Sequence, residues 1–292
     1  MNKQKILQAG KIATEVKEWI KPQIKKGTPL IEIAEKIEDK IFELGGEPAF
    51  PTNLSINEIA AHYTPSHDDE TIAQGLLKVD FGAHVDGWIS DTAFSIDLEN
   101  SEENKKLIEA SEEALKSAIQ TAKEGVKISE IGKAIQDTIN EKGFSPIINL
   151  SGHEIDEYDL HAGLSIPNID DGRAEILEEG LYAIEPFATN GNGKVKDGRP
   201  SGIYMIIDPK NIRSPIAREV LEFCADNYGN LPFCSRWVVK ELGTKALFGL
   251  KQLEQNGNLH HFEQLVEVSG AKVSQAEHTI FVEKEKTTIT TQ

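Results

Sequence analysis

Apolar residues recur every three or four positions in four stretches of the chain. This spacing places apolar side chains on one face of an α-helix, so it predicts helices over residues 3–26, 29–44, 102–123 and 129–142. Two stretches share one pattern, with Leu30, Ile33, Ile37 and Ile41 in the first and Ile128, Ile131, Ile135 and Ile139 in the second. Apolar segments between the helices predict strands at residues 51–61, 147–150, 160–166, 181–188, 273–283 and 287–291.

A β-hairpin is predicted between the two helix pairs, because the strong turn dipeptide Asp86-Gly87 joins two apolar segments. A turn centred on Val85 and Asp86 would place Asp80 opposite Asp91. Like charges directly opposite each other destabilise a strand pair, so this register predicts a cation between the two carboxylates. A register shifted by one residue would instead leave both acids in solvent.

The chain also repeats itself. Residues Gly27–Pro48 match Gly125–Pro146 at a constant offset, and both copies then reach an Asn-Leu-Ser tripeptide. Further along, a glycine is followed five residues later by an acid in both halves, at Asp80 and Glu185. Long self-similarity indicates a duplicated structural unit, and two copies predict a pseudo-two-fold pair. The acids of both halves could then converge on the axis between them.

Residues 192–258 have no counterpart in the first half. This region opens with Gly-Asn-Gly and Lys-Asp-Gly-Arg-Pro, which predict loops, and continues with helical patterns over 215–228, 236–242 and 245–255. We therefore expect one α+β catalytic domain over residues 1–292, with 192–258 as a helical insertion subdomain within the second repeat.

Composition limits the possible functions. The chain has 292 residues, 39% of them hydrophobic, which is enough to bury a substantial core. A net charge of −17 argues against direct binding of nucleic acid through a basic surface. No apolar run approaches the ~18 residues of a membrane helix, and the charged N-terminus does not resemble a signal peptide. Cys224 and Cys234 predict a reduced pair in the cytoplasm, although a bridge between them is not excluded.

Several acids and histidines lie in apolar or small-residue surroundings that suit a buried site. Glu185 and Glu277 adjoin apolar strands, where a carboxylate needs a partner. His153 follows a glycine at a predicted strand end, while His62 and His161 have small neighbours that leave room for a ligand. Taken singly, the two acids could be salt-bridged and the three histidines could be loop or core residues. Four other histidines are predicted to lie on the surface: His67, His84, His260 and His261.

As a set, these residues predict a metal centre. Asp80, Asp91, His153, Glu185 and Glu277 offer mostly oxygen ligands. Five protein ligands are too many for one catalytic zinc, but they suit two divalent ions bridged by carboxylates and a hydroxide. Such a site admits Mn, Fe, Co or Zn.

The order of these five residues resembles the dinuclear site of the methionine aminopeptidases, which have the creatinase-like pita-bread fold. The resemblance covers essentially the whole chain. The segments that carry it are Asn53-Leu-Ser-Ile-Asn-Glu-Ile-Ala-Ala-His62-Tyr-Thr-Pro65, Asn149-Leu-Ser-Gly-His153, His161-Ala-Gly-Leu-Ser-Ile-Pro-Asn168, Glu185-Pro-Phe-Ala-Thr189 and Glu277-His-Thr279. The helical insertion is similar to that of type 2 enzymes, and the absence of a long charged extension resembles archaeal members. Ala276 departs from the pattern, since relatives commonly have an aromatic residue there.

The resemblance implies removal of the initiator methionine from nascent polypeptides, favoured when the second residue is small. It implies that Glu185 both binds metal and moves the proton of the attacking water. His161 would hold the substrate carbonyl or oxyanion, and His62 would assist near the scissile amide. Phe50, Phe187 and Phe262 are candidates for the methionine pocket, with ordinary core packing as the alternative. We also expect a monomer that acts in the cytoplasm, with the ribosome as a possible partner.

Two alternatives remain. A prolidase or Xaa-Pro aminopeptidase would share the metals, but not the surroundings of His62 or the insertion. A non-catalytic relative that binds ribosomes or RNA would have lost metal ligands and gained basic tails, whereas this chain keeps all five candidate ligands and a charge of −17.

Overall fold

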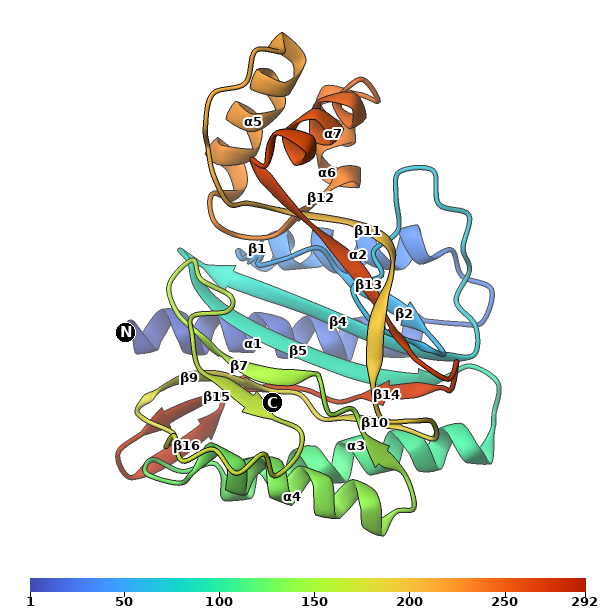
Figure 1. The fold of residues 1–292 in the computed structure, drawn as a ribbon, viewed down its shortest axis with the longest axis vertical. Helices are drawn as coiled ribbons and strands as arrows, with labels where there is room; N and C mark the ends of the chain where they lie inside the picture. Colours follow the sequence, from blue (N-terminus) through green and yellow to red (C-terminus); the bar gives the residue numbers. More distant parts are fainter.

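Helices occupy the positions predicted from apolar spacing in the computed structural model, which describes residues 1–292 (Figure 1). The first α-helix ends earlier than predicted because Pro22 lacks the N–H needed for the next helical hydrogen bond. None of the helices combines the length and apolar character needed to cross a membrane. In chain order the helices are α1 (Lys3–Ile20), the 3₁₀ turn η1 (Lys21–Gln23), α2 (Leu30–Glu43), α3 (Glu102–Thr121), α4 (Ile128–Glu141), α5 (Pro215–Tyr228), α6 (Ser235–Leu242) and α7 (Ala246–Asn256).

The strands form four sheets. The first contains β1 (Glu47–Pro48), β2 (Asn53–Ile56), β4 (Leu76–Val85) and β5 (Trp88–Asp97). The second contains β6 (Ser145–Pro146), β10 (Phe187–Thr189) and β14 (Val273–Gln275). The third contains β3 (Ile59–Ala61), β11 (Val195–Ile206), β12 (Phe233–Cys234) and β13 (Leu259–Glu267). The fourth contains β7 (Ser151–Ile155), β8 (Ser165–Pro167), β9 (Gly180–Ile184), β15 (His278–Glu283) and β16 (Lys286–Ile289).

The sequence repeat is also a structural repeat. α2 leads into β1 as α4 leads into β6, and the matched elements have equal lengths. Before α2, the Gly27 N–H donates to Ala73 O at 2.8 Å; before α4, the Gly125 N–H donates to Leu177 O at 2.8 Å. Each half has its own large apolar cluster, one under α1 and α2 and one under α3 and α4. The predicted duplication is therefore confirmed.

The hairpin register differs from the prediction. Asp86 and Gly87 alone form the turn, with φ values of +47° and +84°, so the turn centre lies one residue later than expected. Asp91 consequently pairs with Gly82 rather than with Asp80. Because side chains alternate along a strand, residues two apart share a face. The two aspartates are diagonal neighbours on one face of the hairpin, and the predicted direct pairing was wrong.

Two strand assignments also differ. The predicted strand at 147–150 is not regular, because the N–H groups of Ile147 and Ile148 bond to two different segments of the chain. β7 begins only at Ser151, so His153 lies within a strand rather than after one. The predicted loop around 196–200 lies inside β11, which pairs with a strand that the sequence did not predict, β13.

One histidine assigned to the surface is buried. His84 is only 5% exposed. Its Nδ1 accepts a hydrogen bond from the Gly87 N–H at 3.2 Å, and its ring packs edge-on against Tyr158. The turn that follows His84 folds the backbone back over the ring, which explains the burial.

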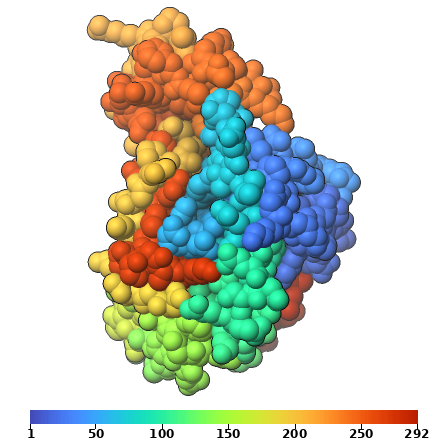
Figure 2. Space-filling view, turned by 90° about the vertical axis from the view of Figure 1, so that its right-hand side faces the viewer, coloured from blue at the N-terminus to red at the C-terminus, as the bar shows by residue number.

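Helices α5–α7 gather at one end of the molecule around their own apolar cluster (Figures 1 and 2). A buried ion pair ties this end to α2: the two Nη atoms of Arg236 donate to the two carboxylate oxygens of Glu38, each at 2.8 Å. Trp237 Nε1 donates to the same carboxylate at 2.8 Å. Burial disfavours the charge of Arg236, but the hydrogen bonds to Glu38 and the nearby negative charges together outweigh that effect and raise the pKa of the guanidinium.

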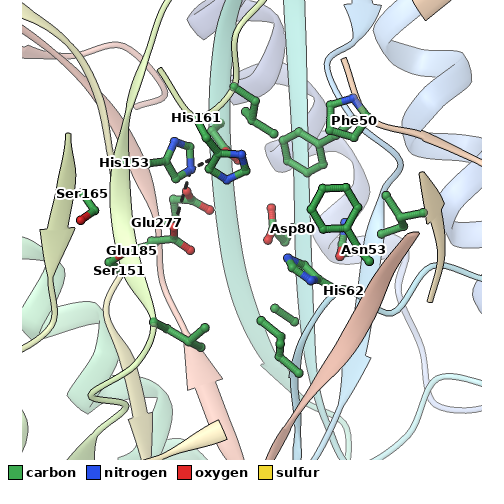
Figure 3. Close-up of a pocket in the computed structure, with 18 of the residues that line it drawn as sticks. Phe50, Asn53, His62, Asp80, Ser151, His153, His161, Ser165, Glu185 and Glu277 are labelled. Atoms are coloured by element: carbon green, nitrogen blue, oxygen red, sulfur yellow. Dashed lines mark ion pairs between the residues drawn. The ribbon is translucent and has the colours of Figure 1, made fainter. Parts of the chain in front are cut away.

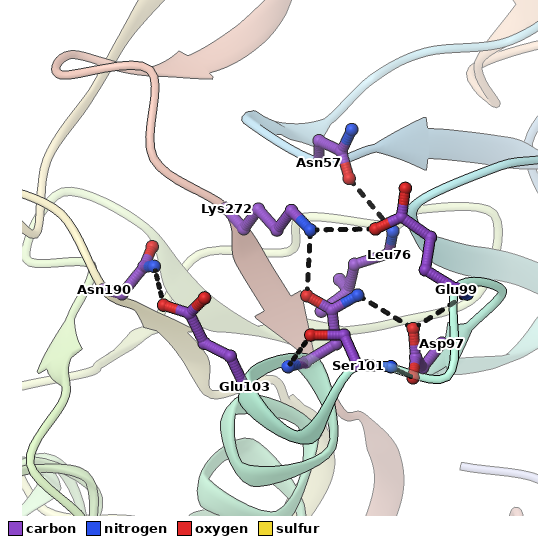
Figure 4. A network of polar contacts seen from close by, with 9 residues as sticks. Asn57, Leu76, Asp97, Glu99, Ser101, Glu103, Asn190 and Lys272 are labelled. Atoms are coloured by element: carbon purple, nitrogen blue, oxygen red, sulfur yellow. Dashed lines mark hydrogen bonds and ion pairs between the residues drawn. The ribbon is translucent and has the colours of Figure 1, made fainter.

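A polar network secures the start of α3 (Figure 4). Asp97, at the end of the hairpin, accepts bonds from the Ser101 N–H at 2.6 Å and from Asn104 Nδ2 at 2.8 Å. Lys272, which precedes β14, donates to Asn104 Oδ1 at 3.0 Å and to Glu99 at 3.1 Å. The hairpin of the first half is thereby held against a helix and a strand of the second half.

Candidate metal centre

All the residues singled out from the sequence line one cavity of about 330 Å³. It lies between the hairpin and the strands of the second half (Figure 3). The members are Phe50, His62, Asp80, Asp91, His153, His161, Glu185, Phe187, Phe262 and Glu277.

Each candidate ligand comes from a different element. Asp80 lies on β4, Asp91 on β5 and His153 on β7. Glu185 lies in the gap between β9 and β10, and Glu277 in the gap between β14 and β15. The backbone at Glu277 remains hydrogen-bonded to the hairpin, because the Glu277 N–H donates to the backbone of β5 at 3.0 Å. The pairing of both halves along the pseudo-two-fold therefore brings the five side chains together.

The side chains meet at short distances. Ligand atoms of Asp91, His153 and Glu277 all lie within 4.8 Å of one another. His153 Nε2 lies 3.6 Å from Asp91 Oδ2 and 3.6 Å from Glu185 Oε1, and these side chains are at most 14% exposed. An imidazole nitrogen that faces two carboxylate oxygens at this distance leaves room for an ion between them.

The electrostatics of this cluster of acids also favour a bound cation. Burial, followed by the charges of the neighbouring acids, raises the pKa values of Asp80, Glu185 and Glu277 well above the ordinary range. Burial raises the pKa of Asp91 to about 8. One oxygen each of Asp80, Asp91 and Glu277 is buried without a hydrogen-bond partner. Buried carboxylates without donors are costly, and divalent cations supply what they lack. The donor set therefore fits a metal centre.

Sequence reasoning missed Gln275, which organises the acids. Its side-chain Nε2 donates to Asp80 Oδ2 at 3.2 Å and lies 3.5 Å from Glu277 Oε2. Its backbone is held by Ser95, whose Oγ accepts from the Gln275 N–H at 2.9 Å and donates to the Gln275 carbonyl at 2.7 Å. The sequence signal for Gln275 is its spacing from Glu277, because residues two positions apart on an extended chain point to the same face.

Two histidines stand beside the acids in neutral form. The ring of His161 lies 4.3 Å from the ring of His153. Desolvation, and then the neighbouring His153 and His62, lower the pKa of His161 to about 3, although the residue is exposed where it lines the cavity. His62 Nδ1 lies 3.1 Å from the Glu263 carbonyl, which can only accept, so Nδ1 carries the proton and Nε2 is an acceptor. His62 has a positive φ of +63°, which indicates a constrained position.

Aromatic side chains form the apolar part of the wall. Phe262 packs edge-on against His62, with 5.6 Å between ring centroids. Phe50 lies so close to the hairpin that a Cβ on Gly82 would approach its ring within 2.5 Å. Phe187 is 2% exposed and belongs to a small apolar cluster beneath the cavity. The cavity therefore combines an acidic floor with an apolar side.

Comparison with protein families identifies the family to which the chain belongs. A model of metallopeptidase family M24 matches residues 4–227. This chain belongs to metallopeptidase family M24. A methionine aminopeptidase from Pyrococcus horikoshii is 46% identical over 297 residues, covering 100% of both chains. These matches confirm the resemblance to methionine aminopeptidases.

Solved structures confirm the predicted pita-bread fold of this M24 protein. A methionine aminopeptidase from Thermotoga maritima matches with a TM-score of 0.72 and 21% identity, over 100% of this chain and 98% of that chain. A thermophilic Arx1 matches with a TM-score of 0.85 and 17% identity, over 98% of this chain and 90% of that chain. At such identities the likeness concerns the fold alone.

Membership of the M24 family gives the acidic cluster a direct interpretation. The family consists of metallopeptidases, and this member has a buried group of Asp91, His153 and Glu277 that could hold a metal ion. The geometry thus agrees with the family in pointing to a metal site on the floor of the cavity.

Proposed function

We propose that this M24 protein hydrolyses the first peptide bond of polypeptides that begin with methionine and releases that methionine. One observation carries the proposal: four buried or half-buried carboxylates and three histidines from both halves of the repeat line a single cavity with an apolar wall. The full-length relatives named methionine aminopeptidase support it. The expected substrates are the N-termini of nascent polypeptides.

The site would hold two divalent ions through Asp80, Asp91, His153, Glu185 and Glu277. Two ions explain why four carboxylates, rather than one or two, are buried together, since their charges balance. Oxygen-rich ligands suit Co, Mn, Fe or Zn. When bound, the ions supply Lewis-acid chemistry, lowering the pKa of water and polarising the scissile carbonyl.

The side chains around the ions would then move protons and orient the peptide. Glu185 would accept the proton of the attacking water and pass it to the leaving amine, a general acid–base role open to a carboxylate that lines the cavity. Neutral His161 would donate a hydrogen bond to the carbonyl oxygen as negative charge develops there. His62 Nε2, an acceptor, would receive the N–H of the scissile amide and so orient the peptide.

The apolar wall would select the first side chain. Phe50, Phe187 and Phe262 would surround the flexible thioether of methionine, and sulfur–aromatic contacts would contribute about 0.3–1.5 kcal/mol each. A free N-terminal amine beside the acidic floor explains why only the first bond would be cut. A small second residue would be favoured because the backbone of that residue must approach the histidines.

Residues 192–258 would form the helical insertion subdomain of a type 2, archaeal-like enzyme. This segment supplies Ile203 and Pro232 to the cavity wall, so the insertion would help to shape the substrate site. We further propose that the enzyme works as a monomer in the cytoplasm, with the ribosome as a docking partner.

Release of free methionine from Met-Gly-Met-Met tests the function directly. The purified protein is stripped with a chelator and then titrated with Mn, Co, Fe or Zn. Metal-dependent release of the first methionine, with Met-Lys peptides left intact, supports the proposal. Cleavage of Ala-Pro peptides instead would favour a prolidase or Xaa-Pro aminopeptidase. No release with any metal, from a protein whose fold is verified by circular dichroism, would overturn the catalytic assignment and favour a binding protein.

A further inference from the structure

A second cavity lies behind the metal centre. Its volume is about 510 Å³, and it lies between α1 and α3, against β5 and the segment from β14 to β15. In Figure 1, α1 passes behind β4 and β5, and α3 runs along the lower edge of the sheets. Ala276 and His278, which flank Glu277, line this cavity, whereas Glu277 itself lines the first one. The two cavities therefore lie on opposite faces of one strand.

Lysines converge on this α1–α3 cavity. Lys17 and Lys21 come from adjacent turns of the first helix and its 3₁₀ extension, and Lys116 comes from α3. Glu112 is the only acidic side chain of the lining. In a chain of net charge −17, three lysines against Glu112 and the carboxylate of Gln292 leave a local excess of positive charge. Such a balance in a concave site attracts anions.

The three lysines have no carboxylate partners. Lys17 Nζ donates only to Thr92 Oγ1, at 3.3 Å. Lys21 Nζ lies over the ring of Phe94, 5.5 Å from its centroid. No ion pair joins the three ammonium groups to Glu112 or to the terminal carboxylate of Gln292, which also lines the cavity. Their charges are therefore available to a ligand.

The floor of the cavity is rigid and close to the metal ligands. Thr92 Oγ1 donates to the Glu277 carbonyl at 3.0 Å, and the Glu277 N–H donates to the Ala93 carbonyl at 3.0 Å. Asp91 is held in the same way, since its N–H donates to Thr279 Oγ1 at 2.7 Å. Small residues at Ala93 and Ala276 leave the space above this floor open.

From this arrangement we infer that the α1–α3 cavity binds a small, multiply charged phosphate-bearing anion. Tetrahedral phosphate groups offer several acceptor oxygens, which three ammonium groups arriving from two helices can satisfy together. The amide of Gln120 adds a further donor at the rim. This site is separate from the peptide-binding cavity, and the inference does not rest on the proposed peptidase activity.

Isothermal titration calorimetry with inorganic phosphate and pyrophosphate tests the inference on the full chain. The metal-loaded and the chelator-treated protein are titrated side by side, because phosphates could also bind metal ions. Binding in the α1–α3 cavity persists after chelation. Lys116→Met and Lys21→Met should each weaken it about tenfold, equivalent to about 1.4 kcal/mol. Glu112→Gln should tighten it, because a like charge is removed from the lining.

Lys106→Met is the matched control. Lys106 is also an exposed lysine of α3, but it lies outside the lining, so its replacement should leave the affinity unchanged. The inference is overturned by either of two results. One is the absence of binding at about 10 mM pyrophosphate. The other is binding that disappears on chelation, or that responds to neither Lys116→Met nor Lys21→Met.

Discussion

Replacing Arg236 with methionine should strongly destabilise the protein. The guanidinium makes two hydrogen bonds of 2.8 Å to Glu38 and a third, of 3.1 Å, from Nε to the Pro65 carbonyl. The side chains of Arg236 and Glu38 are only 4% and 6% exposed. Methionine fills a similar volume but leaves the Glu38 carboxylate buried without its countercharge. Breaking a buried pair from one side costs about 3–5 kcal/mol.

The expected loss is large enough to measure in two ways. A chain of this size loses about 2–4 °C of melting temperature per kcal/mol, so the melting temperature should fall by roughly 6–20 °C. Urea denaturation should give the same free-energy difference, with metal concentration held constant because bound metal itself stabilises the fold. The KM for a methionyl peptide should rise while metal content stays unchanged, because α5–α7 support part of the wall and none of the ligands.

Two further variants make the reasoning refutable. Glu38→Leu combined with Arg236→Met replaces the pair with apolar groups and should recover part of the loss, since no unpaired charge remains. Lys133→Met removes an exposed pair with Asp137 and should leave the urea midpoint unchanged. If Arg236→Met costs less than about 1 kcal/mol, or the double variant is no more stable than the single one, the ion pair does not hold this end of the molecule.

Three other predictions concern the metal centre. The chelator-treated protein should melt at a higher temperature near pH 7 than near pH 8: the native state raises the pKa of Asp91 from 3.8 to about 8, so Asp91 binds more protons in the native than in the unfolded chain in this window, which lies above the ordinary histidine pKa, and stability falls as pH rises. A flat profile would contradict this. His62→Ala should retain metal, as measured by mass spectrometry, but its turnover should fall about 10²–10⁴-fold. Asp91→Ala should instead lose metal. A fully active His62→Ala variant would contradict the role proposed for His62. Gly152→Ala should destabilise the β7–β9 pair and lower metal content, because the added Cβ would lie 2.2 Å from the Ala183 carbonyl oxygen; a melting temperature equal to that of the parent protein would refute this steric argument.

Features with a short period or an internal copy were the most predictable from sequence. The apolar spacing at Leu30, Ile33 and Ile37 sets a helix independently of distant residues, and its repetition in α4 revealed the duplication. The acids Asp80 and Glu185 stood out because each lies five residues after a matched glycine. The convergence of the candidate residues on one cavity then follows from the symmetry of the two halves.

Features that depend on one residue of register or on distant partners were not predictable. The hairpin turn moved by a single residue, which changed the partner of Asp91. β11 contains Lys-Asp-Gly-Arg-Pro, a typical loop composition, and becomes a strand only because β13 pairs with it. The Glu38–Arg236 pair joins residues far apart in the chain, and no local sequence pattern predicts it.

The distribution of the candidate ligands along the chain has a consequence for biosynthesis. They run from Asp80 to Glu277, and the last of them lies in the final strand region. A chain that is still emerging from the translation machinery cannot assemble the full donor set until β14 and β15 have been made. On the proposed ligand set, the complete metal site therefore forms only late in synthesis, and metal capture would be one of the last steps of maturation.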